Sequence, residues 1–307
     1  MASSGSKHWA ALSNETAELV EEAGASVVAV HGGRWLAGSG VHWRTGVVVT
    51  ANHLLRRDED LDVILPNGSS VAGTLVGRDP STDIAALKIE NATLPVAQTV
   101  GLEALKVGHF VLAVGRSTRG EVAASAGIVA RLGGPWKTWR GGHIDQLLRP
   151  DVTLYLGQSG SALVNGDGRV LGINTSVLAR RATITVPAVT VDRVLFELLR
   201  RGYIARPYLG VAMQPVPLPE DVRHKLKLES NAGLLVLHAE AEGPASTAGV
   251  MLGDVIVALQ GRPVADVRDV LQQLSELHTG ESAKVTIARG GEKVELAVTI
   301  GERPRRK

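Results

Sequence analysis

The 307-residue chain contains no cysteine. Disulfides, thiolate nucleophiles and cysteine-type zinc sites are therefore excluded, and the absence is compatible with either side of a bacterial membrane. A strong excess of one charge is also lacking, because the formal net charge is only +2. Basic residues are scattered apart from the tail at 303–307, which we interpret as a solvated terminus. The charge balance therefore predicts no nucleic-acid partner.

Long hydrophobic runs are lacking as well. No stretch approaches the roughly 20 apolar residues of a membrane span, and residues 1–11 (MASSGSKHWAA) contain no apolar run of signal-peptide length. Taken as written, the sequence predicts a soluble, cytoplasmic protein. If the N-terminus replaces the natural one, an export signal would be missing, and a periplasmic or cell-envelope location stays open.

Aromatic residues make up only 3% of the chain, whereas glycine is abundant, at 35 residues. Glycines separate short runs rich in Val, Ile and Leu, and they supply the positive-φ conformations of tight turns. The runs lie at 26–31, 38–43, 45–50, 62–65, 70–77, 84–89, 110–114, 123–132, 162–164 and 170–174. Strands this short and frequent predict a mainly β protein with closed or sandwiched antiparallel sheets.

Two helical patterns frame this β-rich region. Residues 14–23 predict a short helix capped by Asn14, and residues 190–202 place apolar side chains on one face before Gly202. Beyond it, strands at 233–238, 254–259, 283–289 and 294–300 alternate with an amphipathic helix at 266–276. We therefore divide the chain into an N-terminal segment with a short helix (1–24), a β domain (25–202) and a small α/β domain (203–303).

Two residues of the β domain have the chemistry of a catalytic base and its partner. His53 directly follows an apolar strand, so a rigid element positions its imidazole. Asp83 directly precedes the strand 84–89, where a buried carboxylate would need a partner such as an imidazole N–H. Taken singly, a histidine such as His53 is more often a surface or satisfied residue, and an aspartate such as Asp83 is more often a turn residue that leads into a strand.

A serine flanked by glycines supplies the third candidate. Ser159 lies in the sequence Gly157-Gln158-Ser159-Gly160, which permits a tight turn that exposes a hydroxyl. Such a turn also lets backbone N–H groups converge on a developing oxyanion. A serine hydroxyl is a poor nucleophile near neutral pH unless a base activates it, and the base needs an acid to fix its tautomer. The chain order His, Asp, Ser is that of the chymotrypsin-type double barrel.

Four segments resemble sequence motifs of the HtrA/Deg family, whose members are trypsin-like serine proteases, here with one C-terminal PDZ domain. They are 49–54 (VTANHL), 79–88 (DPSTDIAALK), 157–164 (GQSGSALV) and 170–175 (VLGINT). The resemblance implies two six-stranded β-barrels in residues 25–202, a triad of His53, Asp83 and Ser159, and an oxyanion hole formed by the N–H groups of Gly157 and Ser159. It implies no cofactor, and the other histidines lack the spacing of metal ligands.

The segment after the nucleophile departs from the family pattern. Ser161 and Ala162 stand where the family usually has Gly-Pro, and Gln158 replaces the usual Asn. If the position of Ser161 requires a glycine-only conformation, the turn would be strained. Two functions therefore stay in competition: an active endopeptidase, and a proteolytically impaired HtrA-like chaperone or PDZ scaffold.

Substrate selection is expected at a pocket between two segments, 151–156 and 176–182. Thr153, Leu154, Ile173 and Val177 suggest an uncharged pocket that takes small or medium aliphatic residues on the acyl side of the scissile bond. Residues 133–142 (GGPWKTWRGG) carry Trp136 and Trp139. They read either as an activation or contact loop or as a surface loop with one ring tucked in.

The C-terminal domain, 203–303, resembles a PDZ domain. Residues 206–211 (RPYLGV) are similar to a carboxylate-binding loop, and 242–245 (EGPA) with 248–256 (AGVMLGDVI) match the family pattern further along. In this reading the N–H groups of Leu209, Gly210 and Val211 capture a peptide C-terminus, and the peptide adds to a sheet edge. Peptide binding to the PDZ domain would either tether the substrate or shift the protease between an inactive and an active state.

The expected function is ATP-independent cleavage of unfolded or damaged proteins, with the PDZ domain binding peptide C-termini. Family members commonly trimerise through the N-terminal region, where Trp9 lies. A homotrimer or a larger homo-oligomer is therefore expected.

Overall fold

A computed structural model describes residues 4–33, 37–90, 92–117, 119–179 and 182–302. The chain forms two compact units, Met1–Ile204 and Ala205–Lys307. Each unit is described by itself.

The first unit begins with helix α1 (Ser4–Gly24), which is followed by a closed antiparallel barrel. The six strands close in the order β1 (Val27–His31), β2 (Ala37–Arg44), β3 (Val47–Ala51), β6 (Ile84–Ile89), β5 (Ser70–Asp79) and β4 (Leu61–Ile64). A short 3₁₀ turn, η1 (Asn52–Leu54), follows β3. Buried side chains of β1, β3, β4 and β6 fill this barrel.

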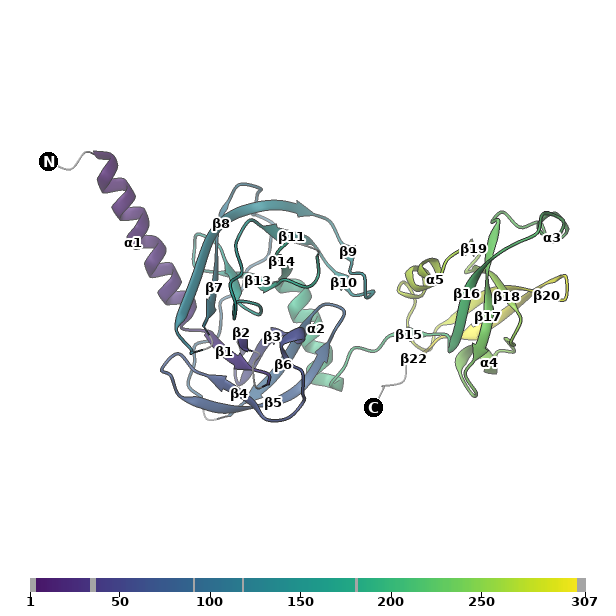
Figure 1. The fold of residues 1–307 in the computed structure, drawn as a ribbon, viewed down its shortest axis with the longest axis horizontal. Helices are drawn as coiled ribbons and strands as arrows, with labels where there is room; N and C mark the ends of the chain where they lie inside the picture. Colours follow the sequence, from purple (N-terminus) through teal and green to yellow (C-terminus); the bar gives the residue numbers. More distant parts are fainter. Residues whose placement is uncertain (1–3, 34–36, 91, 118, 180–181, 303–307) are drawn as a thin grey trace. The chain divides into compact units, whose positions relative to one another are not determined.

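A second closed barrel follows (Figure 1). Its order is β11 (Leu147–Pro150), β14 (Ile184–Pro187), β13 (Val170–Thr175), β12 (Ala162–Val164), β7 (Phe110–Arg116) and β8 (Val122–Gly133). The hairpin β9 (Trp136–Lys137) and β10 (His143–Ile144) extends between β8 and β11. The predicted mainly β architecture with two six-stranded barrels is confirmed.

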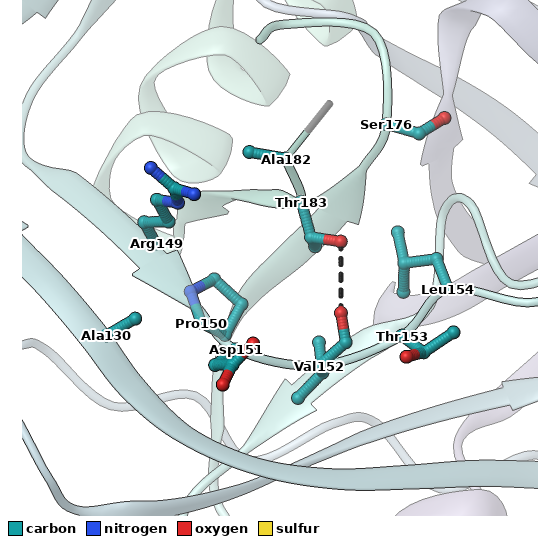
Figure 2. Close-up of a pocket in the computed structure, with 10 residues that line it drawn as sticks. All are labelled: Ala130, Arg149, Pro150, Asp151, Val152, Thr153, Leu154, Ser176, Ala182 and Thr183. Carbon is teal, nitrogen blue, oxygen red and sulfur yellow. Dashed lines mark hydrogen bonds between the residues drawn. The ribbon is translucent and has the colours of Figure 1, made fainter. Parts of the chain in front are cut away.

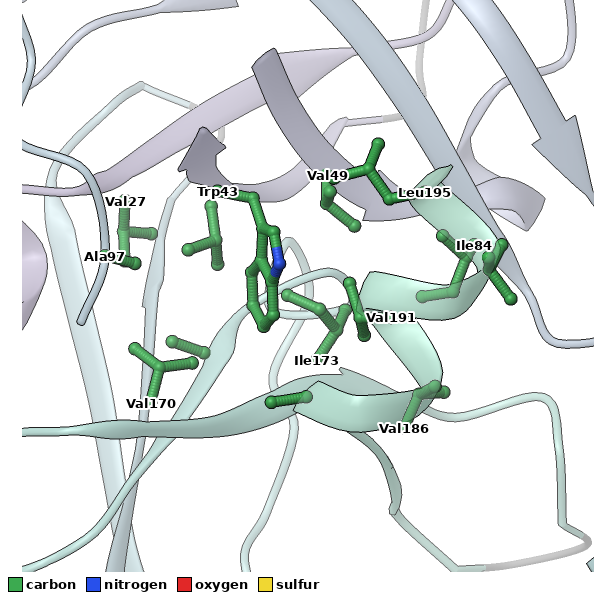
Figure 3. Packing of buried hydrophobic residues seen from close by; sticks show 14 of the residues in the cluster. Val27, Trp43, Val49, Ile84, Ala97, Val170, Ile173, Val186, Val191 and Leu195 are labelled. Atoms are coloured by element: carbon green, nitrogen blue, oxygen red, sulfur yellow. The ribbon is translucent and has the colours of Figure 1, made fainter. Parts of the chain in front are cut away.

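The largest core lies between the barrels and is covered by helix α2 (Ala188–Arg201). Figure 3 shows the Trp43 ring from the first barrel among Ile173 of the second barrel and Val191 and Leu195 of α2. The Trp43 indole N–H donates to Asp192 at 2.9 Å, so the one polar atom of this ring has a partner. Because this core joins the inner faces of both barrels, it fixes the residues that lie between them.

Helix α1 is longer than predicted. It spans Ser4–Gly24, and Asn14 lies inside it rather than at its cap, so the predicted start was wrong. Its C-terminal end packs on the barrels through Leu19, Val20 and Ala23. The preceding turns have few apolar side chains, and Trp9 is 74% exposed, so periodicity gave no sign of them.

The second unit has its own core under an antiparallel sheet and three helices. The sheet order is β16 (Val211–Pro217), β17 (Ala232–Ala239), β18 (Val255–Leu259), β20 (Ser282–Arg289) and β21 (Glu292–Thr299), with β19 (Arg262–Pro263) on β18. A two-stranded sheet joins β15 (Pro207–Tyr208) to β22 (Gly301–Glu302), and the helices are α3 (Glu220–Leu226), α4 (Pro244–Thr247) and α5 (Val267–Leu274). Helix α5 starts in a capping box formed by Asp266 and Asp269.

Candidate active site

The pairing of β3 with β6 brings His53 and Asp83 together. Ala51 lies opposite Ile84, so the residues that follow β3 meet those that precede β6. His53 Nδ1 lies 2.7 Å from Asp83 Oδ2, and the His53 backbone N–H donates to Asp83 Oδ1 at 2.9 Å. The Asp83 side chain is buried, whereas 26% of the His53 side chain is exposed. A buried carboxylate thus holds an imidazole whose other face reaches solvent.

Asp83 adopts a left-handed backbone conformation, with φ of 59°. Aspartate tolerates this region better than most residues, and the buried turn around it supplies further support. In the same turn, the Asp79 carboxylate accepts hydrogen bonds from Ser81 Oγ at 2.6 Å and from Thr82 Oγ1 at 2.8 Å. This hydrogen-bonded turn over-determines the position of the Asp83 carboxylate.

Thr175, at the end of β13, adds a third hydrogen bond to that carboxylate. Its hydroxyl donates to Asp83 Oδ2 at 2.5 Å, and the residue is buried. The segment 170–175 was recognised from the sequence, but this contact was missed, because it joins the two barrels over 92 positions of sequence. Asp83 therefore faces donors from both barrels.

Ser159 lies in a turn that two left-handed glycines shape. Gly157 has φ of 91° and Gly160 has φ of 82°. Among the described residues, neither the Gly157 nor the Ser159 N–H donates to another group of the protein. The Ser159 hydroxyl lies 3.3 Å from Ser176 Oγ, and no hydrogen bond joins it to His53 in the described part of the chain. The geometry thus joins two of the three predicted residues and leaves the third paired with Ser176.

The residues that depart from the family pattern have local explanations. Ser161 is buried outside the left-handed region, and its hydroxyl accepts from Asn174 Nδ2 at 3.0 Å. The strain considered for Ser161 therefore does not arise. Gln158 is fully buried, and its Oε1 accepts the Tyr155 N–H at 2.9 Å, while its Nε2 has no partner in the described structure.

A cavity of about 360 Å³ opens beside Ser176 (Figure 2). Its lining comes from the two expected segments, from β8 and β11, and from Thr183, which directly precedes β14: Ala130, Arg149, Pro150, Asp151, Val152, Thr153, Leu154, Ser176, Ala182 and Thr183. The expected contributions of Thr153 and Leu154 are present. Those of Ile173 and Val177 were wrong, because Ile173 is buried in the core between the barrels and Val177 lies outside the lining.

The pocket was expected to be uncharged, and this expectation was wrong. Arg149 and Asp151 line it, and Figure 2 shows the Thr183 hydroxyl bonded to the Val152 carbonyl across one wall. Asp151 lies in the expected segment 151–156, but its charge was not assigned to the pocket. Arg149 was missed because β11 has only four residues, too few for an alternating pattern to show which side chains line the cavity.

The comparisons with known proteins agree with this geometry. A model of the trypsin-like peptidase domain matches residues 38–173, and a model of the PDZ domain matches residues 207–300. The crystal structure of the serine endoprotease from Yersinia pestis matches with a TM-score of 0.69 and 28% identity, covering 95% of this chain and 98% of that one. The chain combines a trypsin-like peptidase domain with one PDZ domain, and its structural neighbours include HtrA-type proteases.

Other relatives of this chain carry related names. The HtrA-type protease AlgW with decapeptide shares the fold, with a TM-score of 0.70 at 24% identity, over 94% of this chain and 99% of that one. The probable periplasmic serine endoprotease DegP-like of Pseudomonas putida is 33% identical over 264 residues, which is 84% of this chain and 54% of the relative. The chain thus spans about half the length of the curated relatives it matches.

The PDZ unit presents its own candidate site at the loop between β15 and β16. Gly210 has φ of 78°, and the N–H groups of Leu209 and Gly210 donate to no other described group. The Glu240 N–H donates to the Gly210 carbonyl, so Val211 and Ala239 form a non-hydrogen-bonded pair and the Val211 N–H points away from β17. Strand β16 lies at the edge of its sheet, next to α5.

Among the described residues, no group of three or more His, Asp or Glu side chains could hold a metal ion. None of the helices in the described part of the chain combines the length and the apolar character of a membrane span.

The tryptophan loop is the last feature that the sequence left open. Trp136 is partly buried against the core between the barrels, whereas Trp139 is 73% exposed with Arg140 stacked 4.5 Å from its ring centroid. The Thr138 hydroxyl donates to the Ser81 carbonyl at 2.7 Å. One ring is thus tucked in, and the loop is anchored on the turn that carries Asp83.

Proposed function

We propose that this chain is a serine endopeptidase with Ser159 as nucleophile, His53 as general base and Asp83 as the acid that orients the base. The 2.7 Å contact between His53 Nδ1 and Asp83 Oδ2 carries the proposal. A carboxylate accepts the Nδ1 proton, so Nε2 keeps the lone pair that takes the proton of the Ser159 hydroxyl. The Thr175 hydroxyl and the His53 N–H hold the carboxylate in place while the imidazole becomes charged.

Attack by Ser159 Oγ on a peptide carbonyl places negative charge on the carbonyl oxygen. The unbonded N–H groups of Gly157 and Ser159 are the donors that stabilise it. His53 then gives its proton to the leaving amine, and a water molecule repeats the sequence on the acyl-enzyme. In the resting state the Ser159 hydroxyl is paired with Ser176, so substrate binding must turn it toward His53.

The cavity beside Ser176 takes the residue on the acyl side of the scissile bond. Arg149 and Asp151 carry opposite charges, so together they offer no net charge for selection. Thr153, Leu154 and Ala182 leave a site for small or medium aliphatic residues. A peptide library that showed a strong preference for Arg or Lys at this position would exclude this specificity.

The substrates are unfolded or damaged proteins, and the PDZ loop at Leu209, Gly210 and Val211 binds peptide C-termini. The free N–H groups at this loop and the open edge of β16 support the second statement. The chain assembles as a homotrimer or a larger homo-oligomer, for which the exposed Trp9 of α1 offers an apolar contact. The names of the DegP-like relatives favour a periplasmic location.

The decisive test is digestion of fluorescent casein by the wild-type protein and by Ser159→Ala side by side. The wild type should cleave casein and react with a fluorophosphonate probe, and Ser159→Ala should do neither. Ser176→Ala serves as a matched control, because it removes a neighbouring hydroxyl and leaves the nucleophile. Equal cleavage by wild type and Ser159→Ala would overturn the proposal.

The alternative is a proteolytically impaired chaperone or PDZ scaffold. It is favoured by one observation, the absence of a hydrogen bond between Ser159 and His53 in the described structure. Well-folded protein that binds unfolded casein but takes up no fluorophosphonate would establish this second function.

The role of the PDZ loop is tested with Gly210→Trp. A side chain at Gly210 would start 3.2 Å from Pro244 Cδ, in a left-handed conformation, so the loop should lose its carboxylate site. The variant should fail to bind a C-terminal peptide in fluorescence anisotropy. If that peptide accelerates casein cleavage by the wild type but not by Gly210→Trp, the PDZ unit activates the protease; an effect confined to substrates that carry the peptide indicates tethering.

A further inference from the structure

Ser39 links the first barrel to the turn that carries the nucleophile. It lies in β2 and is fully buried. Its own carbonyl accepts the Thr50 hydroxyl at 2.6 Å, and its Oγ accepts the Arg116 N–H of β7 at 2.8 Å. Strands of both barrels therefore fix Ser39, independently of its contacts with the turn.

The Ser39 hydroxyl holds the peptide that follows Gly157. It donates to the Gly157 carbonyl at 2.8 Å. The N–H of the same peptide, that of Gln158, donates to the Tyr155 carbonyl at 3.0 Å. Both polar ends of this peptide are thus bonded, and its plane cannot rotate without breaking two buried hydrogen bonds.

The Ser39 backbone holds the peptide that follows Ser159. Its N–H donates to the Ser159 carbonyl at 2.8 Å. The N–H of that peptide, on Gly160, donates to the Asn174 carbonyl at 2.8 Å. The plane of the second peptide is fixed in the same way as that of the first.

The two fixed peptides alternate with the two that carry the unbonded N–H groups of Gly157 and Ser159. From this alternation we infer that Ser39 is a positioning residue of the oxyanion hole: it pins the carbonyls of Gly157 and Ser159 so that both N–H groups stay directed at the reacting carbonyl. The inference rests on the proposed serine endopeptidase function. Ser39 touches no substrate atom and acts through the turn.

Gly115 leaves room for the Ser39 hydroxyl that bonds to the Gly157 carbonyl. A Cβ at Gly115 would lie 2.7 Å from Ser39 Oγ and 3.0 Å from Ser161 Cβ. The strand β7 thus has no side chain where the Ser39 hydroxyl passes toward Gly157. Gly115→Ala would displace that hydroxyl without removing it, since the glycine does not need a left-handed conformation.

The test compares Ser39→Ala and Gly115→Ala with the wild type and with Ser26→Ala. Ser26 is a matched control, because its buried hydroxyl donates to the Ala23 carbonyl, away from the turn. The substrate is a peptide spanning a casein bond that the wild type cleaves. Loss of one oxyanion donor lowers kcat by about 10²–10³, so a displaced turn should lower kcat by about 10- to 100-fold with KM within about 3-fold. Ser26→Ala should match the wild type.

Hydrogen–deuterium exchange supplies a readout that needs no activity. The amides of Gln158 and Gly160 should exchange at least about 10-fold faster in Ser39→Ala and Gly115→Ala than in the wild type and Ser26→Ala. Unchanged exchange, or an unchanged kcat in an active protein, would overturn the role of Ser39. A different outcome is a wild type that neither cleaves casein nor binds fluorophosphonate while the Gln158 and Gly160 amides still exchange faster in the variants. In that case the endopeptidase proposal fails, but the role of Ser39 in fixing the turn is retained. If Ser39→Ala does not fold, Gly115→Ala decides.

Discussion

Asp83 shows how a single residue can be placed by the fold and used by the chemistry. Its left-handed backbone would be costly for most side chains, and the buried turn at Asp79 holds it there. Its carboxylate accepts hydrogen bonds from His53 and Thr175. A buried carboxylate with this many donors keeps one orientation, which is what an imidazole partner requires.

Asp83→Asn should leave the protein folded and nearly inactive. Asn also tolerates the left-handed region, but its amide removes the charge and presents an N–H to His53, so the imidazole adopts the wrong tautomer. We expect kcat to fall by about 10³- to 10⁴-fold, measured on a casein-derived peptide. Asp62→Asn, at an exposed position of β4, is the control. Loss of less than about tenfold would show that Asp83 does not orient the base.

Asp254 of the PDZ unit offers a stability test with a defined pH dependence. Burial opposes ionisation of its carboxyl, but the hydrogen bonds and charge of Arg289 and the Met251 N–H outweigh burial and lower its pKa. Because the folded pKa lies below the ordinary value of about 3.9, the stabilisation is complete above that pH and is lost as the pH falls through the folded pKa.

Asp254→Asn should therefore destabilise the PDZ unit at pH 7 and matter less in acid. Removing one partner of this bidentate pair should cost about 1–3 kcal/mol at pH 7, and the difference should shrink below about pH 4. Urea unfolding followed by far-UV circular dichroism measures both values. Asp266→Asn is unsuitable as a control because Asp266 caps α5, so Asp221→Asn on α3 is used instead. A constant difference from pH 7 to pH 2 would contradict the assignment.

At the scale of elements, the sequence predicted the strands and helices that are long enough to show a hydrophobic period. It missed the elements that are too short to show one. The runs that became β3, β6 and β7 and the helix α2, which ends before the left-handed Gly202, follow from alternation and helical spacing. The hairpin β9–β10 and the four-residue helix α4 give no such signal. The start of α1 was missed for lack of an apolar face.

The site divides in the same way. His53, Asp83 and Ser159 were predicted because they lie in recognisable segments. Thr175 and Ser39 were not assigned their contacts, since these depend on how one barrel meets the other. Such contacts are set by packing between strands distant in sequence, and a linear pattern does not contain them.

Arg116 joins three elements and should be needed for the stability of the first unit. The residue is 4% exposed, and its guanidinium donates to the carbonyls of Val27 at 2.5 Å, Gly120 at 2.6 Å and Gly24, the last residue of α1, at 2.8 Å. Burial lowers its pKa, and no carboxylate in the described part of the chain pairs with it. It compensates the carbonyl end of α1 while fixing β1 and β7.

Arg116→Met should lower the free energy of unfolding by about 2–4 kcal/mol, because three buried carbonyls lose a donor. Arg131→Met, on an exposed position of β8, is the control. Tryptophan fluorescence in urea reports this transition selectively, since all five tryptophans lie before residue 140. A change below about 0.5 kcal/mol would show that the three bonds contribute nothing net.

At the scale of the whole molecule, the two units have separate cores. Buried apolar residues of the barrels and α2 form three clusters within 23–198, and those of the PDZ unit form one within 209–300. The division after Ile204 also leaves every strand of both barrels in one unit. A unit with a complete core and no missing strand should fold without the other.

Residues 1–204 produced alone should therefore fold and cleave casein. We expect the tryptophan-fluorescence transition in urea to stay within about 0.5 kcal/mol of that of the full chain, because no core residue has been removed. Residues 205–307 should unfold cooperatively by circular dichroism and still bind a C-terminal peptide, whereas the same fragment with Gly210→Trp should not. Fragment 1–204 contains both the triad and Ser39. If it folds but does not cleave casein, the PDZ unit is required for turning the Ser159 hydroxyl from Ser176 toward His53.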